Sequence, residues 1–168
     1  MMLEVALEAD EEWDSSNSWE KLAQDAAHAA IAESAFPGLA KSERPVEISI
    51  RLTGDDEVRA LNAEWRGKDK PTNVLSFPML DPAEIQQTDA DGPELLLGDI
   101  ILARGVCEAE AEDKGIAVED HATHLLVHGT LHLLGYDHHD DDEAADMEAR
   151  ETRALARLGI ANPYEEAA

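Results

Sequence analysis

Histidine is the residue type whose distribution in this sequence points most directly to chemistry. Six of the seven histidines fall between residues 121 and 139. His121, His124, His128 and His132 follow one another at intervals of three or four residues, so their imidazoles share one face of a helix. The other side chains of that helix are mostly apolar, which predicts that it is buried. Burying an unpaired imidazole costs about 1 to 3 kcal/mol, so the cluster needs a partner.

A divalent cation is the simplest partner for this cluster. His128 and His132 are four residues apart and can direct their nitrogens to one point at about 2.0 to 2.1 Å, the distance that zinc prefers. Gly135 can adopt the left-handed conformation that ends the helix and returns the chain, which brings His138 over the same point. We therefore predict one Zn²⁺ per chain, bound by His128, His132 and His138, with a fourth position open for a reactant. The alternatives are a purely structural zinc and core histidines whose hydrogen bonds are satisfied without a metal.

The residue after the first predicted ligand bears on the kind of zinc chemistry. The spacing H-x₃-H-x₂-G-x₂-H is that of a class of zinc proteases, which carry a glutamate where this chain has Gly129. The protease hypothesis therefore lacks its general base. Glycine inside a helix costs about 1 kcal/mol relative to alanine, so we expect Gly129 to allow a strand or a substrate to approach closely. His124 and Asp137 are candidates for outer positions that orient a ligand by hydrogen bonding. The alternatives are a packing role for His124 and a turn-forming role for Asp137.

A short basic stretch stands out from an acidic chain. Across residues 59–70 four basic residues face two acidic ones, a local charge of 4 − 2 = +2, whereas 13 Lys+Arg and 38 Asp+Glu give the whole chain −25. If this stretch faces the metal, Arg66 can bind a phosphate oxygen through two hydrogen bonds. Lys68 and Lys70 would add to the same substrate contact. A loop paired to nearby carboxylates is the simpler alternative.

The overall charge and composition exclude several classes of protein. A net charge of −25 argues against nonspecific nucleic-acid binding and against attachment to an anionic membrane surface. The single Cys107 excludes a disulfide framework. The first residues show neither a basic region nor an apolar one, so we expect a cytoplasmic protein.

The hydrophobic pattern predicts how the chain is built around these residues. We expect a single α+β domain over residues 1–168, a layer sandwich with a mixed sheet of about four strands and about five helices in the order β-α-β-α-β-β-α-α-α. Residues 79–94 read as an irregular acidic segment. The predicted strands span about 3–7, 46–52, 73–77 and 95–103, and the predicted helices begin near residues 18, 55, 104, 118 and 141.

Two blocks of sequence resemble the YbeY family of bacterial endoribonucleases and ribosomal RNA maturation factors. The first is LNAEWRGKDKPTNVLSFP, residues 61–78, and the second is HGTLHLLGYDH, residues 128–138. The order of predicted elements also fits from about residue 3 to residue 164. The resemblance implies a zincin-like fold with His128, His132 and His138 as zinc ligands. It also implies that Arg66 and His128 are catalytic.

The resemblance further implies a substrate and partners. Members of the family cut single-stranded RNA, process ribosomal RNA precursors, and act in ribosome quality control with the small ribosomal subunit and assembly factors. Neither DNA nor a membrane is expected as a partner. This chain differs from the family in its strong acidity, which argues against an extended basic surface that binds RNA.

Our hypothesis from the sequence is metal-assisted hydrolysis of RNA phosphodiesters. Zinc would polarise a phosphoryl oxygen and lower the pKa of its water toward about 7, and Arg66 would stabilise the charged transition state. The nucleophile is either that water or the neighbouring 2′-OH. The main alternative is a non-catalytic ribosome-assembly factor with a structural zinc. A zinc peptidase or amidohydrolase that takes its base from Asp137 is a weaker one.

Overall fold

Four strands form one mixed sheet in the order β1-β2-β4-β3. The computed structural model describes residues 3–10, 13, 19–41, 45–86, 95–137 and 140–164. β1 (Leu3–Ala9), β2 (Val46–Thr53) and β4 (Leu95–Ala103) run parallel, and β3 (Val74–Pro78) pairs antiparallel with β4 at one edge. The helices are α1 (Trp19–Ala32), the 3₁₀ helix η1 (Pro37–Lys41), α2 (Asp55–Arg66), α3 (Pro82–Gln86), α4 (Arg104–Lys114), α5 (Val118–Leu133) and α6 (Asp141–Arg157).

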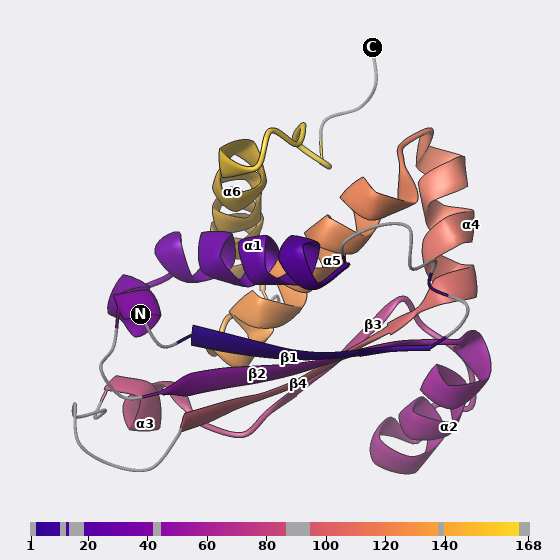
Figure 1. The fold of residues 1–168 in the computed structure, drawn as a ribbon, viewed down its shortest axis with the longest axis horizontal. Helices are drawn as coiled ribbons and strands as arrows, with labels where there is room; N and C mark the ends of the chain where they lie inside the picture. Colours follow the sequence, from indigo (N-terminus) through magenta and orange to yellow (C-terminus); the bar gives the residue numbers. More distant parts are fainter. Residues whose placement is uncertain are drawn as a thin grey trace.

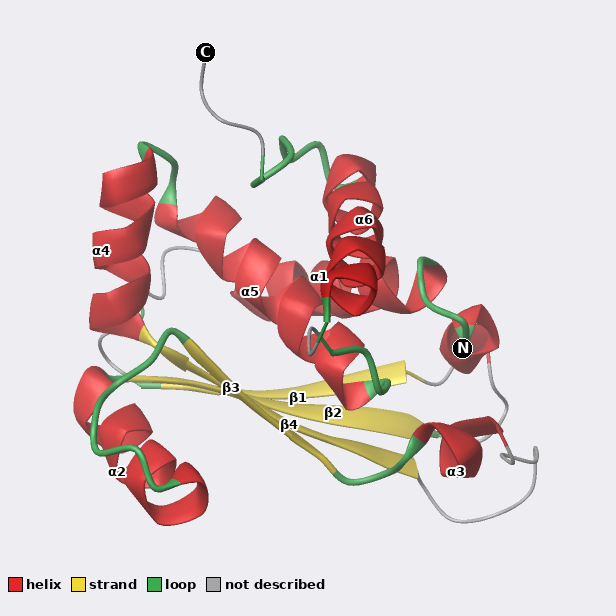
Figure 2. Ribbon diagram, turned by 180° about the vertical axis from the view of Figure 1, so that it is seen from behind, coloured by secondary structure: helices red, strands yellow, loops and turns green. Residues whose placement is uncertain are grey.

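The helices cover the two faces of the sheet unequally. α1, α5 and α6 lie on one face, and α2 lies on the other (Figures 1 and 2). Alternation along the strands explains this division, because neighbouring residues point to opposite faces. Ile100 lies against α5, whereas Ile101 packs with Val58 of α2 in a smaller cluster. The larger core therefore lies between the sheet and α5, which is buried along most of its length.

Two glycines let α5 approach the sheet. Gly98 of β4 has a φ of 146°, and a Cβ there would lie 2.3 Å from the carbonyl oxygen of Phe77 and 2.7 Å from a methyl group of Leu133. A Cβ at Gly129 of α5 would lie 3.0 Å from Ile100 and 3.1 Å from the hydroxyl of Ser76. The close approach expected at Gly129 is therefore that of the sheet.

The architecture agrees with the α+β layer sandwich predicted from the sequence. The order of strands and long helices is as expected, and β4 and α4 have the predicted bounds. One difference lies in the acidic segment 79–94, where residues 82–86 form α3. Asp81 caps this turn, since its side chain accepts a hydrogen bond from the backbone N–H of Glu84 at 2.8 Å. Residues 87–94 lie outside the described residues.

Candidate metal centre

The chain reverses direction directly after α5, at the glycine that the sequence singles out. Gly135 has a φ of 100°, in the left-handed region. The backbone N–H of Tyr136 donates to the carbonyl of Leu131 at 3.0 Å, which closes the end of the helix. The hydroxyl of Tyr136 accepts a hydrogen bond from the N–H of Ala35 at 2.8 Å, and the Arg150 guanidinium lies 4.7 Å from its ring centre. This turn is thus anchored to the segment after α1 and to α6.

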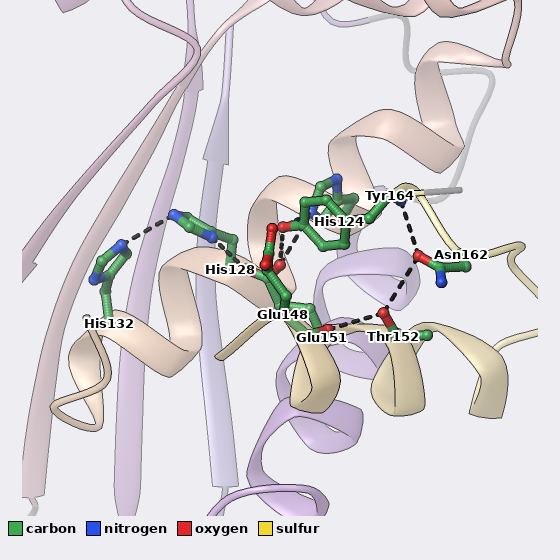
Figure 3. A network of polar contacts seen from close by, with 8 residues as sticks. All are labelled: His124, His128, His132, Glu148, Glu151, Thr152, Asn162 and Tyr164. Atoms are coloured by element: carbon green, nitrogen blue, oxygen red, sulfur yellow. Dashed lines mark hydrogen bonds and ion pairs between the residues drawn. The ribbon is translucent and has the colours of Figure 1, made fainter. Parts of the chain in front are cut away.

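His128 and His132 direct their Nε2 atoms at each other from successive turns of α5 (Figure 3). The two atoms are 2.9 Å apart. Two nitrogens that share one tetrahedral zinc at 2.0 to 2.1 Å lie about 3.3 Å apart, so the pair is close to the separation that a shared cation requires. Both side chains are partly exposed, which leaves them accessible from solvent. The donor pair therefore fits a divalent cation that accepts imidazole nitrogen.

The third predicted ligand cannot be placed from this structure. His138 lies outside the described residues. Within the described ranges no group of three or more His, Cys, Asp or Glu side chains is arranged to hold a metal ion. The three-histidine site accordingly stays a prediction. Asp137 is partly buried just beyond the turn at Gly135, and its orienting role is a prediction as well.

A buried carboxylate lies behind the histidine pair. Glu151 of α6 is fully buried, and its side chain accepts hydrogen bonds from Nδ1 of His128 and from the hydroxyl of Tyr164 (Figure 3). Nε2 of His124 lies 3.4 Å from the same carboxylate and 3.2 Å from the Tyr164 hydroxyl. Burial would raise the pKa of Glu151, but the hydrogen bonds from His124, His128 and Tyr164 lower it to about 2. Burial and the Glu151 carboxylate raise the pKa of Tyr164, which stays a donor.

His121, near the N-terminus of α5, contacts a different carboxylate. Its Nε2 lies 2.8 Å from Glu110 of α4, which also accepts a hydrogen bond from Asn73 at 3.0 Å. Burial lowers the pKa of His121, and the hydrogen bond to Glu110 opposes that shift only in part. Asn73 precedes β3 directly, so this contact connects α4 and α5 to the edge strand beside the site.

Neither Gly129 nor Cys107 supplies a reactive group at the histidine pair. Position 129 faces Ile100 and Ser76 of the sheet, so a glutamate there would be directed into the core. Burial raises the pKa of the Cys107 thiol to about 12, and nearby Glu110 adds to the shift, so this cysteine is not a nucleophile at neutral pH. Position 129, which holds the general base in zinc proteases, therefore supplies no base for the zinc-peptidase alternative.

The basic loop, residues 66–73, lies at the end of α2 and carries three exposed basic side chains. Arg59 lies before the loop, on α2, and forms an ion pair with Asp69 at 2.8 Å. The side chains of Arg66, Lys68 and Lys70 are exposed and make no hydrogen bond or ion pair within the described part of the chain.

The loop is held by a buried asparagine. Asn62 of α2 donates from its side-chain amide to the carbonyl of Lys70 at 2.8 Å, and its own backbone carbonyl accepts from the N–H of Lys68 at 3.2 Å. Arg66 makes no hydrogen bond or ion pair with His128 or His132 among the described residues, and α2 and α5 lie on opposite faces of the sheet (Figure 2). The position of Arg66 at the metal remains a prediction.

Sequence reasoning missed Glu151 and Tyr164 as site residues. Their contacts to α5 depend on the packing of α6 and of the segment that follows it. One signal was present for Glu151, because it lies on the apolar stripe of α6 with Met147, Ala154 and Leu155. A carboxylate on the buried face of an amphipathic helix requires a partner, and that requirement alone marks it as a candidate.

Fold and site together define an α+β protein with a candidate metal centre on its central buried helix. The chain belongs to the YbeY family, since the family model described as Endoribonuclease YbeY matches residues 6–159. The resemblance inferred from the sequence is thereby confirmed.

Relatives cover nearly the whole chain. Endoribonuclease YbeY of Rhizorhabdus wittichii is 56% identical over 97% of both chains. Endoribonuclease YbeY of Sphingopyxis alaskensis is 51% identical over 97% of this chain and 98% of its own. The solution structure of a Thermotoga maritima protein covers 97% of this chain and 100% of its own with a TM-score of 0.55 and 20% identity, which supports the fold alone.

Proposed function

We propose that this chain is a metal-dependent endoribonuclease that cuts single-stranded RNA. The observation that carries the proposal is the approach of the Nε2 atoms of His128 and His132 to 2.9 Å on one face of α5. Membership of a family whose relatives are named endoribonucleases assigns RNA as the substrate.

The groups that act on the substrate follow from their chemistry. His128, His132 and His138 hold the metal, which we propose to be one Zn²⁺ per chain. When bound there, zinc would act as a Lewis acid toward a phosphoryl oxygen and would lower the pKa of water. Arg66, Lys68 and Lys70 bind phosphate oxygens of the RNA, and Arg66 is the best suited of the three because its guanidinium binds phosphate in a bidentate manner.

The identity of the nucleophile is open to a direct test. Attack by water leaves a linear phosphate end, whereas attack by the neighbouring 2′-OH leaves a 2′,3′-cyclic phosphate. Mass spectrometry of the product ends distinguishes the two.

We propose ribosomal RNA precursors as the cellular substrate, with the small ribosomal subunit and its assembly factors as partners. Residues 1–168 act as a single catalytic domain in this proposal. The cytoplasm is the compartment in which such precursors occur.

Removal of one predicted ligand tests the metal-dependent reaction. His132→Ala should lower cleavage of single-stranded RNA by at least about 100-fold and reduce bound zinc, since even outer partners of metal ligands cost about 10- to 100-fold when removed. The measurements are gel assays on single- and double-stranded RNA, with and without chelator, beside elemental analysis.

His28→Ala is the matched control for that variant. Its ring contacts Gln24 at 3.0 Å on α1, outside the site, so this variant should keep both cleavage and metal. Cleavage that persists in fully metal-free wild-type protein would refute the proposal.

The position of Arg66 on α2 favours a substrate-binding role that is separable from the metal. Arg66→Ala should therefore retain zinc and lose cleavage, while Arg153→Ala on α6 should retain both. If the Arg66→Ala protein still supports ribosome maturation in a strain that lacks the wild-type chain, the non-catalytic assembly factor becomes the better description.

A further inference from the structure

Glu151 is a buried carboxylate at a position of α6 where an apolar side chain would satisfy the packing of the helix. Its neighbours on the buried stripe of α6 are apolar, and its side chain is 0% exposed. An isolated carboxylate in such a place is strongly unfavourable unless several donors satisfy it. Glu151 has three donors, one each from His124, His128 and Tyr164.

The contact to His128 determines which nitrogen of that ring carries the proton. A carboxylate only accepts hydrogen bonds, so Nδ1 of His128 must be the protonated nitrogen in this contact. Neutral imidazole carries one proton, and Nε2 is therefore left with its lone pair. That lone pair points toward Nε2 of His132, at 2.9 Å.

Tyr164 fixes the carboxylate in turn. Its hydroxyl donates to Glu151 Oε2, the oxygen that also faces His124, while the other oxygen serves His128. The Tyr164 ring lies edge-on to His124, with 5.5 Å between ring centres. The segment after α6 thus reaches back to the carboxylate behind the histidine pair (Figure 3).

We propose that Glu151, held in place by Tyr164, is the positioning residue of the metal centre, which directs the Nε2 lone pair of His128 toward the cation. The inference rests on the metal-binding role in the proposed function. Glu151 does not touch the substrate and acts through His128. The negative charge of Glu151 also makes the Nε2 lone pair of His128 a stronger donor to a bound cation.

Glu151→Gln is the variant that separates positioning from packing. The side chain keeps its size, but the amide can donate to Nδ1 of His128, which favours the tautomer with the proton on Nε2. Zinc titrated into metal-free protein against a chromophoric chelator should bind about 10- to 100-fold more weakly. Long-range ¹H–¹⁵N spectra of the metal-free protein should show His128 changing from the Nδ1–H to the Nε2–H tautomer.

Glu33→Gln is the matched control for loss of a structural carboxylate. Glu33 accepts from Arg153 at 2.9 Å and from Arg157 at 2.6 Å, so it ties α1 to α6 away from the histidines. This variant should lose stability and keep the zinc affinity and the His128 tautomer of the wild type. A purely structural role for Glu151 predicts the same pattern for Glu151→Gln.

Tyr164→Phe keeps the test informative if Glu151→Gln does not fold. It removes one hydroxyl and should weaken zinc binding roughly fivefold, the effect of one hydrogen bond. Zinc affinity within twofold of wild type in both variants, with an unchanged tautomer, would overturn the inference. A wild-type chain that binds zinc but does not cut RNA would refute the proposed function and leave the positioning role standing, whereas one that binds no divalent cation would overturn both.

Discussion

At position 129 the absence of a side chain decides how α5 meets the sheet. A Cβ there would lie 3.0 Å from Ile100 and 3.1 Å from Ser76, closer than an unstrained contact allows. In a zinc protease the same sequence position holds the catalytic glutamate. In this chain position 129 faces the core. Glycine at this position therefore lets α5 pack closely on the sheet, in addition to removing the general base of the proteases.

We expect Gly129→Glu to damage the fold without creating a peptidase. The new side chain would be forced against Ile100 and its charge would be buried, which should lower the free energy of unfolding by about 2 to 4 kcal/mol. Urea denaturation measures this loss, and a peptide substrate panel measures the activity. Ala145→Glu, on the exposed face of α6, is the control and should change stability by less than about 0.5 kcal/mol. A stable Gly129→Glu protein that cleaves peptides would contradict the assigned orientation.

At the scale of elements, α6 brings Glu151 to His128 only while it stays packed against α5 and α1. Glu33, just after α1, accepts hydrogen bonds from Arg153 and Arg157, and its backbone carbonyl accepts from Arg150 at 2.7 Å. Three arginines of one helix thus converge on one residue. The hydrogen bonds from Arg157 and Arg153 lower the pKa of Glu33.

The lowered pKa of Glu33 predicts a pH-dependent contribution to stability. Its folded-state pKa lies below the ordinary value of 4.5, so the contribution is complete above that pH and is lost as pH falls through the folded-state pKa. Glu33→Gln should therefore cost about 1 kcal/mol at pH 7, since both arginines are 54% exposed and solvent screens the pair. The cost should disappear in acid, as measured by urea denaturation across pH.

Asp25→Asn is the control for that experiment, because Asp25 pairs with Lys21 on the exposed side of α1. Its effect should stay below about 0.5 kcal/mol. If the difference between wild type and Glu33→Gln instead grows as the pH falls, Glu33 does not stabilise the fold through its ionised form.

At the scale of the whole molecule, a chain of net charge −25 has to bind a polyanion. The exposed cations of the basic loop, Arg66, Lys68 and Lys70, offer a local exception, and charges beyond about 8 to 10 Å are screened at physiological salt. Because of this screening, RNA binding should depend on a few short-range contacts.

None of the helices in the described part of the chain is long and apolar enough to cross a membrane.

Replacing Lys68 and Lys70 together by Ala should weaken RNA binding and flatten its salt dependence. Each phosphate contact to a single strand contributes a slope of about −0.7 in log affinity against log salt, so two contacts should remove about 1.4. Fluorescence anisotropy with a labelled RNA across a salt series measures the slope. Lys21→Ala on α1 is the control. An unchanged slope in the double variant would exclude these lysines from the RNA contact.

The sequence by itself determined the order of the strands and long helices, the histidine face of α5 and the turn at Gly135. These features are local, because side-chain period and helix-ending glycines act over a few neighbouring residues. They sufficed to predict the fold class, whereas the family was inferred from the resemblance of residues 61–78 and 128–138 to its members.

Only the tertiary structure decided what lies behind the histidine pair. Glu151 is 23 residues from His128 along the chain, and the two meet because α6 packs against α5. The same holds for Gly129, whose neighbour proved to be the sheet, and for Arg66, which strand alternation places with α2 on the opposite face from α5. Contacts between distant segments follow from how the layers pack, and no local spacing encodes that packing.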